Sequence, residues 1–466
     1  MYDLPLGQVE QDPRYWWLSV LLCLKKIEGK LATKDLCGIG VTGQHVSPVF
    51  MDKESRPLRR AMIWMDKRAV GEAELLTKKL GGLSRVYKLT GVRMGYGFVP
   101  AKVLWFKKNE PLLYKRMKRF SLQSGDFIAF KLCDSFEADL STISNSGMLD
   151  IRHRRYAAEI LDELDIETDA VPLPVSPSEP IGMASRKICS LLGKLRDIPV
   201  VSAGGDVPCS ALGSGVSKPG EATVIMGTAC NLVVCTDDFL LDPKMRFAYM
   251  IHTNDKYRLL FAPSSGGGST ILWVTNVLSQ IFETKIDPRS IDDMAARSPP
   301  GCNGVLFLPY LSGEQSPYWD PLLRGAFFGL DMSTRASDLL RSLLEGVALN
   351  LAYRLSLLES LGINVRTLRV CGGGAKSSVW MKILANATNK AIEVTSVREV
   401  GSAGAAVCAG VATGLFDFNN GVDRFVRLRK VIEPDPNATQ VYQELLEKYE
   451  EASSMLIELT KRHRAI

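Results

Sequence analysis

The sequence has little histidine and no paired cysteines. Only 4 His occur among 466 residues, and the 10 Cys are scattered, with no Cys-x-x-Cys pair. Zinc sites and disulfide frameworks both need such clusters, so the sequence indicates neither of them. Unpaired thiols fit a reducing compartment, and we therefore expect a cytoplasmic protein in which no side chains are assigned to a metal.

Long apolar segments are also missing. Asp3 and Glu10 interrupt the N-terminal residues before a secretory signal could form. The longest candidate for membrane insertion, Val400 to Phe416, is dominated by Gly and Ala rather than by Leu and Ile. This composition predicts a closely packed helix in a protein core, not a membrane span.

Charge of one sign is not concentrated in any part of the chain. The formal net charge is +6, but Lys and Arg are spread along the sequence and mixed with Asp and Glu. This pattern predicts a solvated mixed surface, so nucleic acid is not expected as a partner. A length of 466 residues exceeds what one core usually supports, and the 46% hydrophobic content is enough for two.

Strand patterns alternate with helix patterns along the chain, which predicts an α/β fold. The first half contains a helix, a strand and two further helices, expected over residues 13–28, 36–42, 67–80 and 101–108. Lys218-Pro219-Gly220 is typical of a hinge, and we expect a domain boundary between residues 217 and 218. Apolar residues at helical spacing from Thr439 to Arg462 predict a terminal helix that packs in a core or docks onto the first domain.

One strand runs into a glycine turn that could hold a nucleotide. The strand Leu368 to Cys371 is followed by three glycines and then an amphipathic helix. Glycine lets the backbone approach a ligand, and the first N–H groups of a helix attract an anion, although a plain tight turn is the alternative. We expect the turn to need a special backbone conformation at Gly373. The nucleotide contacts expected here are Gly372, Gly373, Gly374, Ala375 and Ser377.

Two other strands end in glycine turns. The strand Ile198 to Ser202 leads into Gly204-Gly205-Asp206, where the carboxylate could act as a general base or cap a helix that starts near Pro208. Gly227-Thr228 joins two strands of a predicted hairpin, at residues 222–226 and 231–235, and could face phosphate or form an ordinary turn. These strand ends suggest a cleft in which one end holds nucleotide and another presents an acid or base.

Several short motifs occur in the order found in a known family. They are Glu10-Gln11-Asp12-Pro13, Trp16-Trp17, Gly38 to Gln44, Ala61 to Arg68, Gly204 to Asp206, Gly227-Thr228, Leu308 to Glu314 and a spaced signature from Gly325 to Glu345. Each motif is common by itself, but the ordered series is specific. On these matches the chain resembles the FGGY carbohydrate kinases, and among them the xylulokinase branch, over nearly its whole length.

The resemblance implies the two-domain actin-like ATPase (ribonuclease H-like) fold. Residues 1–217 would bind sugar, residues 218–466 would bind nucleotide and end in a docking helix, and the ligands would meet in a cleft between the domains. The implied reaction is ATP-dependent phosphorylation of a sugar hydroxyl, most simply that of D-xylulose, with Mg²⁺ as cofactor and with a homodimer left open. The alternatives are a kinase for another ketose or polyol and a noncatalytic protein that binds nucleotide or sugar.

The resemblance also assigns roles to individual residues. Asp206 falls on the position of the catalytic base and would contact the sugar. The other residues with implied contacts are Gln44, His45 and Asp66 for the sugar and Gly227 and Thr228 for the phosphates. Trp64 could stack on a sugar face, although a core tryptophan is equally consistent with the sequence.

The sequence departs from the family pattern at several of these sites. Xylulokinases read Gly-Gln-Met-His-Gly where this chain has Gly43-Gln44-His45-Val46-Ser47, so the imidazole is displaced by one position. Val207 follows the implied base where Asn or Gln is usual, and Gln315 and Ala229-Cys230 replace an Arg and a Ser-Gly. The sugar assignment is therefore weaker than the family assignment.

The start of the sequence departs from the pattern as well. Family members open with a β-hairpin that carries an Asp-Gly-Thr type of loop and half of the phosphate clamp, and Met1 lies beyond the corresponding position. We expect the coding DNA upstream of Met1 to encode this hairpin in frame. The alternative is an impaired or noncatalytic relative.

Overall fold

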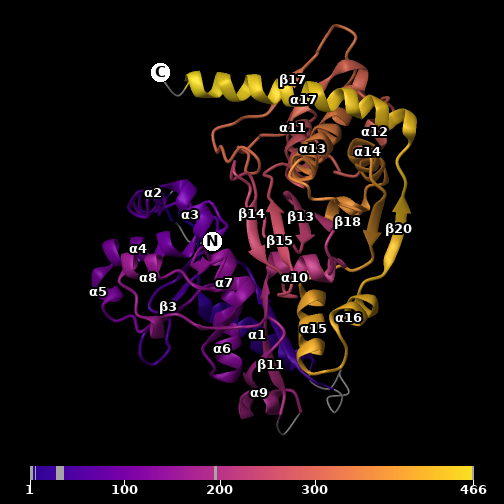
Figure 1. Cartoon of the computed structure of the whole chain (residues 1–466). Coiled ribbons are helices and arrows are strands. Elements are labelled where there is room, and N and C mark those ends of the chain that lie inside the picture. The colour runs from indigo at the N-terminus through magenta and orange to yellow at the C-terminus, as the bar shows by residue number, and fades with distance from the viewer. Residues whose placement is uncertain (1–3, 6, 28–35, 194–196, 464–466) are drawn as a thin grey trace. The chain divides into compact units, whose positions relative to one another are not determined.

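The computed structural model describes residues 4–5, 7–27, 36–193 and 197–463 (Figure 1). The chain forms two compact units, each built from helices and strands, as the α/β prediction requires. The first unit comprises Met1–Gly213, Asp237–Leu259 and Glu399–Phe425, and the second comprises Ser214–Thr236, Leu260–Arg398 and Val426–Ile466. The single boundary between residues 217 and 218 stays a prediction.

The three-stranded sheet of the first unit positions two of the predicted loops. Its strands lie in the order β10 (Pro180–Met183), β11 (Pro199–Gly205) and β2 (Ile39–Gly43). β11 and β2 run parallel, with Gly205 opposite Gly43. Both strands were predicted, although β2 begins three residues later than expected and β11 continues to Gly205. Because parallel neighbours end at the same edge of a sheet, the loops after β2 and β11 begin side by side.

Further strands of the first unit pair two by two. They are β1 (Glu10–Gln11) with β4 (Ala61–Met62), β3 (Val49–Met51) with β5 (Arg119–Ser121), β6 (Glu137–Asp139) with β9 (Leu173–Val175), and β7 (Leu149–Asp150) with β8 (Arg155–Tyr156). The strand β14 (Ala248–Ile251) belongs to the same unit.

The described helices of the first unit include the three predicted ones, whose ends agree to within three residues, although Glu28, the expected end of the first, lies outside the described residues. They are α1 (Pro13–Ile27), α2 (Val70–Lys79), α3 (Leu83–Thr90), α4 (Val99–Asn109), α5 (Pro111–Tyr114), α6 (Ser124–Cys133), α7 (Leu140–Ser146), α8 (Ala158–Leu164), α9 (Arg186–Leu191), α10 (Asp206–Gly213), α15 (Val400–Ala412) and α16 (Phe418–Phe425).

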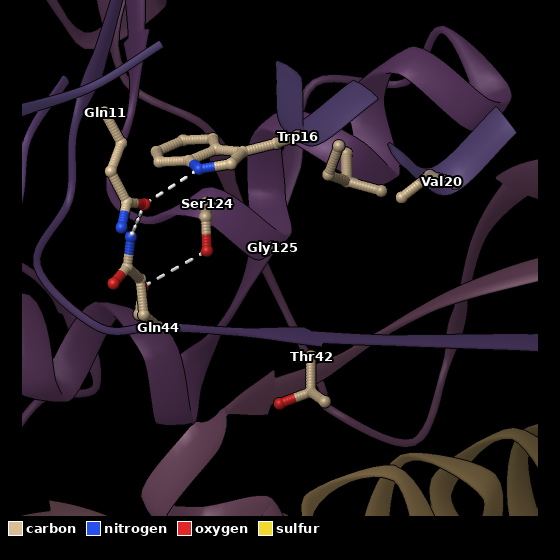
Figure 2. A pocket seen from close by; sticks show the side chains of 8 residues that line it. Gln11, Trp16, Val20, Thr42, Gln44, Ser124 and Gly125 are labelled. Carbon is tan, nitrogen blue, oxygen red and sulfur yellow. Dashed lines mark hydrogen bonds between the residues drawn. The ribbon is translucent and has the colours of Figure 1, made fainter. Parts of the chain in front are cut away.

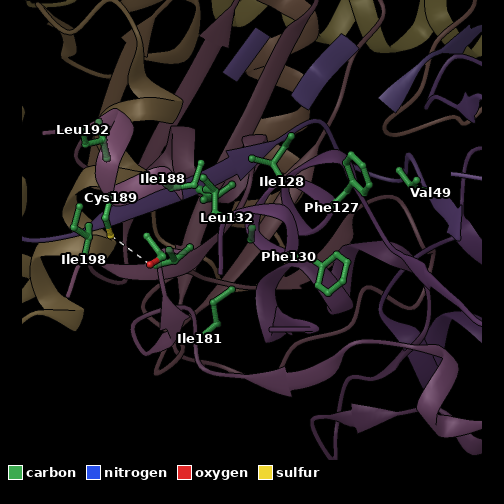
Figure 3. Packing of buried hydrophobic residues seen from close by; sticks show 14 of the residues in the cluster. Val49, Phe127, Ile128, Phe130, Leu132, Ile181, Ile188, Cys189, Leu192 and Ile198 are labelled. Atoms are coloured by element: carbon green, nitrogen blue, oxygen red, sulfur yellow. Dashed lines mark hydrogen bonds between the residues drawn. The ribbon is translucent and has the colours of Figure 1, made fainter. Parts of the chain in front are cut away.

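Apolar side chains from α6, α9 and β11 form a core of the first unit. Figure 3 shows Ile128 and Leu132 of α6 near Ile188 of α9, and Phe127 of α6 on the side of Val49. These side chains are almost fully buried, and Trp16 and Trp17 of α1 pack against the same cluster. Burial of one such apolar side chain stabilises a fold by about 1.5–3 kcal/mol. This core therefore fixes the sheet whose edge carries the loops described above.

α15 packs on β2 and α10 at glycine positions. A Cβ on Gly40 or on Gly213 would lie 2.1 or 1.9 Å from a carbonyl oxygen of α15, and a Cβ on Gly404 would lie 2.0 Å from the carbonyl oxygen of Cys209. The backbones therefore touch where only hydrogen fits. The closely packed helix predicted over Val400 to Phe416 is confirmed up to Ala412. None of the helices in the described ranges is long and apolar enough to cross a membrane.

The larger sheet holds the predicted hairpin in the second unit. β12 (Glu221–Met226) and β13 (Cys230–Thr236) are its strands, which confirms the hairpin. β12 also runs parallel to β18 (Thr367–Cys371), with Ile225 opposite Cys371. Further strands of this unit are β16 (Leu306–Leu308), β17 (Ala326–Phe328), β19 (Ile392–Thr395), β20 (Leu428–Ile432) and β15 (Arg258–Ala262) from Leu260 onward. The turns after β12 and β18 consequently leave the same edge of the sheet.

The terminal helix α17 (Pro436–His463) packs within the second unit. Its other helices include α11 (Gly268–Ile281), α12 (Ser290–Ala295), α13 (Ala336–Glu359) and α14 (Ser378–Thr388), and α17 contacts α13 and α14 (Figure 1). Tyr442 donates a hydrogen bond to Glu345 Oε1 at 2.7 Å, and the hydroxyls of Tyr449 and Ser453 each lie 2.8 Å from that of Tyr310. The predicted helix is confirmed, and these contacts give it a core-packing role.

Candidate sugar and nucleotide sites

The sheet of the first unit brings His45 and Asp206 together. His45 lies two residues past the end of β2, and Asp206 directly follows β11. His45 Nε2 lies 3.2 Å from Asp206 Oδ1, close enough for an ion pair but not aligned as a hydrogen bond. Two residues that are 161 positions apart in sequence, 45 and 206, thus form one polar pair.

A glycine makes room for this pair. A Cβ on Gly205 would lie only 1.9 Å from His45 Cε1, so the imidazole ring occupies the space of a side chain. The neighbouring Gly204 has a φ of +112°, which other residues rarely adopt. Gly205, which the sequence analysis assigned to a turn, therefore has a second role, because it lets the ring approach the carboxylate.

The two partners differ in exposure. The His45 side chain is 9% exposed, and burial lowers its pKa, although the charges of Asp206 and Asp139 act in the opposite direction. A neutral imidazole carries one N–H donor and one acceptor. The Asp206 side chain is 53% exposed, so it can meet a ligand.

Asp206 also begins α10, two residues earlier than the helix predicted near Pro208. Its Oδ1 accepts a hydrogen bond from the Val207 N–H at 2.9 Å. This contact is local and resembles a cap, the structural role considered for this residue. The half-exposed carboxylate still leaves room for the catalytic role.

Asp139 is a buried carboxylate that the sequence analysis missed, and it supports the strand that leads to Asp206. Asp139 is fully buried and accepts hydrogen bonds from the Thr142 N–H at 2.9 Å and from the hydroxyls of Thr142 and Ser202 at 2.8 Å each. Burial raises the pKa of this carboxyl, and the hydrogen bonds act in the opposite direction. Ser202 belongs to β11, so Asp139 ties the start of α7 to the strand that ends directly before Asp206.

Gln44 faces a different space from His45. Gln44 Nε2 donates to Gln11 Oε1 at 2.8 Å, and Trp16 Nε1 donates to the same oxygen at 2.9 Å (Figure 2). These side chains line a cavity of about 280 Å³ together with Thr42 and Ser124. His45 and Asp206 do not line it. The structure therefore joins His45 to Asp206 and leaves Gln44 with the segment around Gln11.

Asp66 is also separate from Asp206. It is 1% exposed, and its oxygens accept hydrogen bonds from the Arg68 guanidinium at 2.8–3.1 Å and from the Val9 N–H at 2.8 Å. A sugar hydroxyl would have to compete for these oxygens, so the predicted sugar contact remains untested. Trp64, two residues earlier, is 51% exposed and is free to meet a ligand face.

The larger sheet brings the predicted phosphate turn and the predicted nucleotide turn together in the second unit. Gly227 and Thr228 form the exposed tip of the hairpin, and Gly372 and Gly373 are exposed after β18. A Cβ on Gly372 would lie 2.6 Å from the carbonyl oxygen of Met226, so the turns touch through backbone. Backbone N–H groups at such a joint edge are suited to phosphate.

The three glycines after β18 are not equivalent. Gly372 has a φ of +94° and requires glycine, whereas a Cβ on Gly374 would lie 2.4 Å from Met226 Cγ and would displace that side chain. Gly373 has no left-handed φ, and a Cβ there would meet no atom within 4 Å. The prediction of a special conformation at Gly373 is wrong, because Gly372 supplies it. Gly373 to Lys376 form a short 3₁₀ turn that includes Ala375, and the hydroxyl of Ser377 caps α14 by accepting from the Trp380 N–H at 3.0 Å.

A third glycine run, which the sequence analysis missed, holds the hairpin tip. The N–H groups of Gly268 and Ser269, at the start of α11, donate to the carbonyl oxygens of Gly227 and Thr228 at 2.9 Å each. A Cβ on Gly267 would lie 2.4 Å from the Ala229 carbonyl carbon. The signal was present in the sequence, because Gly266-Gly267-Gly268 precedes a helix as Gly372-Gly373-Gly374 does.

Two buried ionisable side chains, Arg354 and Glu314, contact the hairpin and the loop before α11. Arg354 is fully buried in α13 and donates to the Cys230 carbonyl oxygen at 3.0 Å. Glu314 accepts from the Ser264 hydroxyl and the Ser265 N–H at 2.9 Å each. Burial raises the pKa of Glu314, and Arg354 opposes this shift. Together they anchor the hairpin and the loop before α11.

Known proteins resemble the chain along most of its length. Residues 3–213 match the N-terminal domain, and residues 222–413 the C-terminal domain, of the FGGY family of carbohydrate kinases. A xylulose kinase of Staphylococcus xylosus is 28% identical over 446 residues, which cover 95% of this chain and 91% of that protein. A glycerol kinase of Coxiella burnetii is 28% identical over 428 residues, which cover 88% and 82%.

A solved structure agrees with the fold as well. The crystal structure of a xyloylose kinase from Brucella ovis is 27% identical and has a TM-score of 0.90 over 98% of this chain and 93% of that chain. This similarity confirms the predicted α/β actin-like ATPase fold. The two domain matches together span most of the 466 residues. The chain therefore belongs to the FGGY family of carbohydrate kinases, which phosphorylate sugars with ATP and a divalent metal ion.

Proposed function

We propose that this sugar kinase transfers the γ-phosphoryl group of ATP to a hydroxyl of D-xylulose and that Asp206 is the general base. The pair of Asp206 and His45 at the end of two parallel strands carries the proposal. The name of the Staphylococcus xylosus relative supports xylulose as the sugar, and the glycerol kinase relative makes another polyol the second candidate.

The geometry of the pair suits proton transfer. A sugar hydroxyl is a poor nucleophile until a carboxylate accepts its proton. Asp206 exposes half of its side chain to a ligand, and the neutral imidazole of His45 lies against Oδ1. Oδ2 then remains to accept the proton as the hydroxyl oxygen attacks the γ-phosphorus. His45 would orient the carboxylate and offer a hydrogen bond to a second sugar oxygen.

The second unit offers groups for the nucleotide. The exposed turns at Gly227-Thr228 and Gly372-Gly373 would hold phosphates through backbone N–H groups. Gly374, Ala375 and the start of α14 at Ser377 would lie under the adenosine.

We further propose Mg²⁺ as the metal ion. Mg²⁺ in kinases is held largely by phosphates and water, with one or two carboxylates. When bound, it would neutralise charge on the transferring phosphates. Cytoplasmic location and a homodimer stay predictions from the sequence.

A sugar panel tests this function. Purified protein is incubated with Mg-ATP and ketopentoses, ketohexoses, glycerol or other polyols, and ADP and the sugar phosphate are measured. The expected result is the highest kcat/KM with D-xylulose. A higher value with another polyol would replace the substrate, and ATP binding without ADP formation would favour the noncatalytic alternative.

A further inference from the structure

A buried lysine joins the two loops that carry the proposed sugar contacts. Lys102 of α4 is fully buried. Its Nζ donates to the carbonyl oxygen of Val46 at 2.6 Å and to that of Ile63 at 2.9 Å. Val46 directly follows His45, and Ile63 directly precedes Trp64. One amine thus connects the loop after β2 with the loop after β4.

The loop after β2 needs such a support. Val46 has a φ of +47°, in the left-handed region that a β-branched residue rarely adopts. A conformation of this kind persists only when the surrounding structure enforces it. The hydrogen bond from Lys102 to the Val46 carbonyl oxygen constrains the peptide between Val46 and Ser47, and so holds the turn that directly follows His45.

The amine keeps both contacts whether or not it is charged. Burial lowers the pKa of Lys102 to about 7, and the nearby charge of Asp66 opposes the shift. The neutral amine retains two N–H groups, which matches the two carbonyl oxygens that it contacts. Arg68 is the other charged group that acts on Lys102, and it favours the neutral form. The link between the loops therefore does not depend on the charge.

An amine in an apolar interior is costly unless its hydrogen bonds are satisfied. An aliphatic side chain would fill the same space without that cost, but it would leave two loop carbonyl groups without this donor. We propose that Lys102 is a positioning residue that sets the loops of His45 and Trp64 relative to each other for sugar binding. The sugar-binding part of this proposal rests on the proposed function of these loops.

The test compares Lys102→Met with Lys108→Met. Both residues belong to α4, but Lys108 is about half exposed and contacts Glu72 at 3.4 Å. In Lys102→Met we expect the KM for sugar to rise by about 10–100-fold and kcat to fall, because small displacements of positioning groups are costly. The KM for ATP should change by less than about twofold, since its contacts lie in other loops. Lys108→Met should match the wild type.

Hydrogen exchange measures the loops without any substrate. In Lys102→Met, amides of residues 44–48 and 63–68 should exchange faster, while those of β10 and β11 should not. Unchanged exchange in both loops, or an equal rise in KM for sugar and ATP, would overturn the proposal. Absence of activity on xylulose in the wild type would instead overturn the proposed substrate, and the exchange result would still stand.

A second variant covers the case in which Lys102→Met does not fold. Lys102→Gln keeps two N–H donors on a shorter side chain. Faster exchange confined to the two loops, with a raised KM for sugar, would support the proposal. Faster exchange throughout the first unit would contradict it, because Lys102 would then stabilise the unit as a whole.

Discussion

The imidazole of His45 fills the space that a side chain on residue 205 would need. A Cβ on Gly205 would approach His45 Cε1 to 1.9 Å and Nδ1 to 2.3 Å. The residue before Asp206 is therefore fixed as glycine by the ring opposite it. The residue type at position 205 thus depends on His45, and neither the motif around His45 nor the motif around Gly205 shows this dependence by itself.

Replacing Gly205 tests that relationship. Gly205→Ala should push the imidazole away from Asp206 and lower kcat/KM for sugar by about 10²-fold, since misplacement by 1 Å can cost that much. Gly71→Ala is the matched control, because a Cβ on Gly71 meets no atom within 4 Å. Steady-state kinetics and nucleotide binding are measured for both. Wild-type activity in Gly205→Ala would show that the position of the ring does not matter.

Replacing the carboxylate of Asp206 by an amide should slow the chemical step. We expect Asp206→Asn to lower kcat by about 10²–10⁴-fold, the range for a general base, with ATP affinity nearly unchanged. Asp162→Asn, at an exposed position of α8, serves as control. Turnover numbers come from ADP formation and ATP affinity from calorimetry. If turnover in Asp206→Asn equals that of the wild type, Asp206 has no part in the mechanism.

The buried histidine predicts a pH effect on stability. Burial places the pKa of folded His45 below the ordinary value of 6.5, so the unfolded chain binds this proton more readily. The stability that neutral His45 contributes is complete above pH 6.5 and is lost as the pH falls below that value. The Tm difference between wild type and His45→Gln should therefore shrink from about pH 8 to about pH 5. A constant difference across this range would contradict the assignment.

Substitutions at two glycines of the turn after β18 should have different effects, one on the free energy of unfolding and the other on ATP binding. Gly372→Ala forces a side chain into a left-handed conformation and against Met226, so it should cost about 1–3 kcal/mol of unfolding free energy. Gly373→Val should leave the Tm nearly unchanged, because its Cβ would point into open space beside the turn. It should weaken ATP binding, because the added side chain would occupy space that we assign to the nucleotide. Thermal unfolding and ATP titration check both variants. Equal loss of Tm in the two variants would exclude this division of roles.

Features that depend on neighbouring residues could be predicted from the sequence. The hairpin at Gly227 and the start of α14 after Ser377 follow from local turn and capping rules. Asp66 has partners that its motif did not indicate, because Arg68, two residues away, donates to the oxygens that were assigned to sugar. The sugar contact of Asp66 itself stays a prediction.

Features that depend on distant partners could not be predicted in the same way. Lys102 and Arg354 lie in ordinary helical patterns, and their partners are backbone carbonyl groups of remote segments. Both residues stand among apolar neighbours in the sequence, but nothing there shows which carbonyl groups they would contact. Gln44 and His45 are neighbours, but only the fold shows that one meets Gln11 and the other meets Asp206.

The glycine contacts of α15 have a consequence for synthesis on the ribosome. The segment Glu399–Phe425 belongs to the first unit, although most of the second unit lies between it and residue 213. Gly40 and Gly213 face a helix that does not yet exist when the first 213 residues have been made. The helix that begins with Asp206 therefore acquires its final support only after most of the second unit has been made.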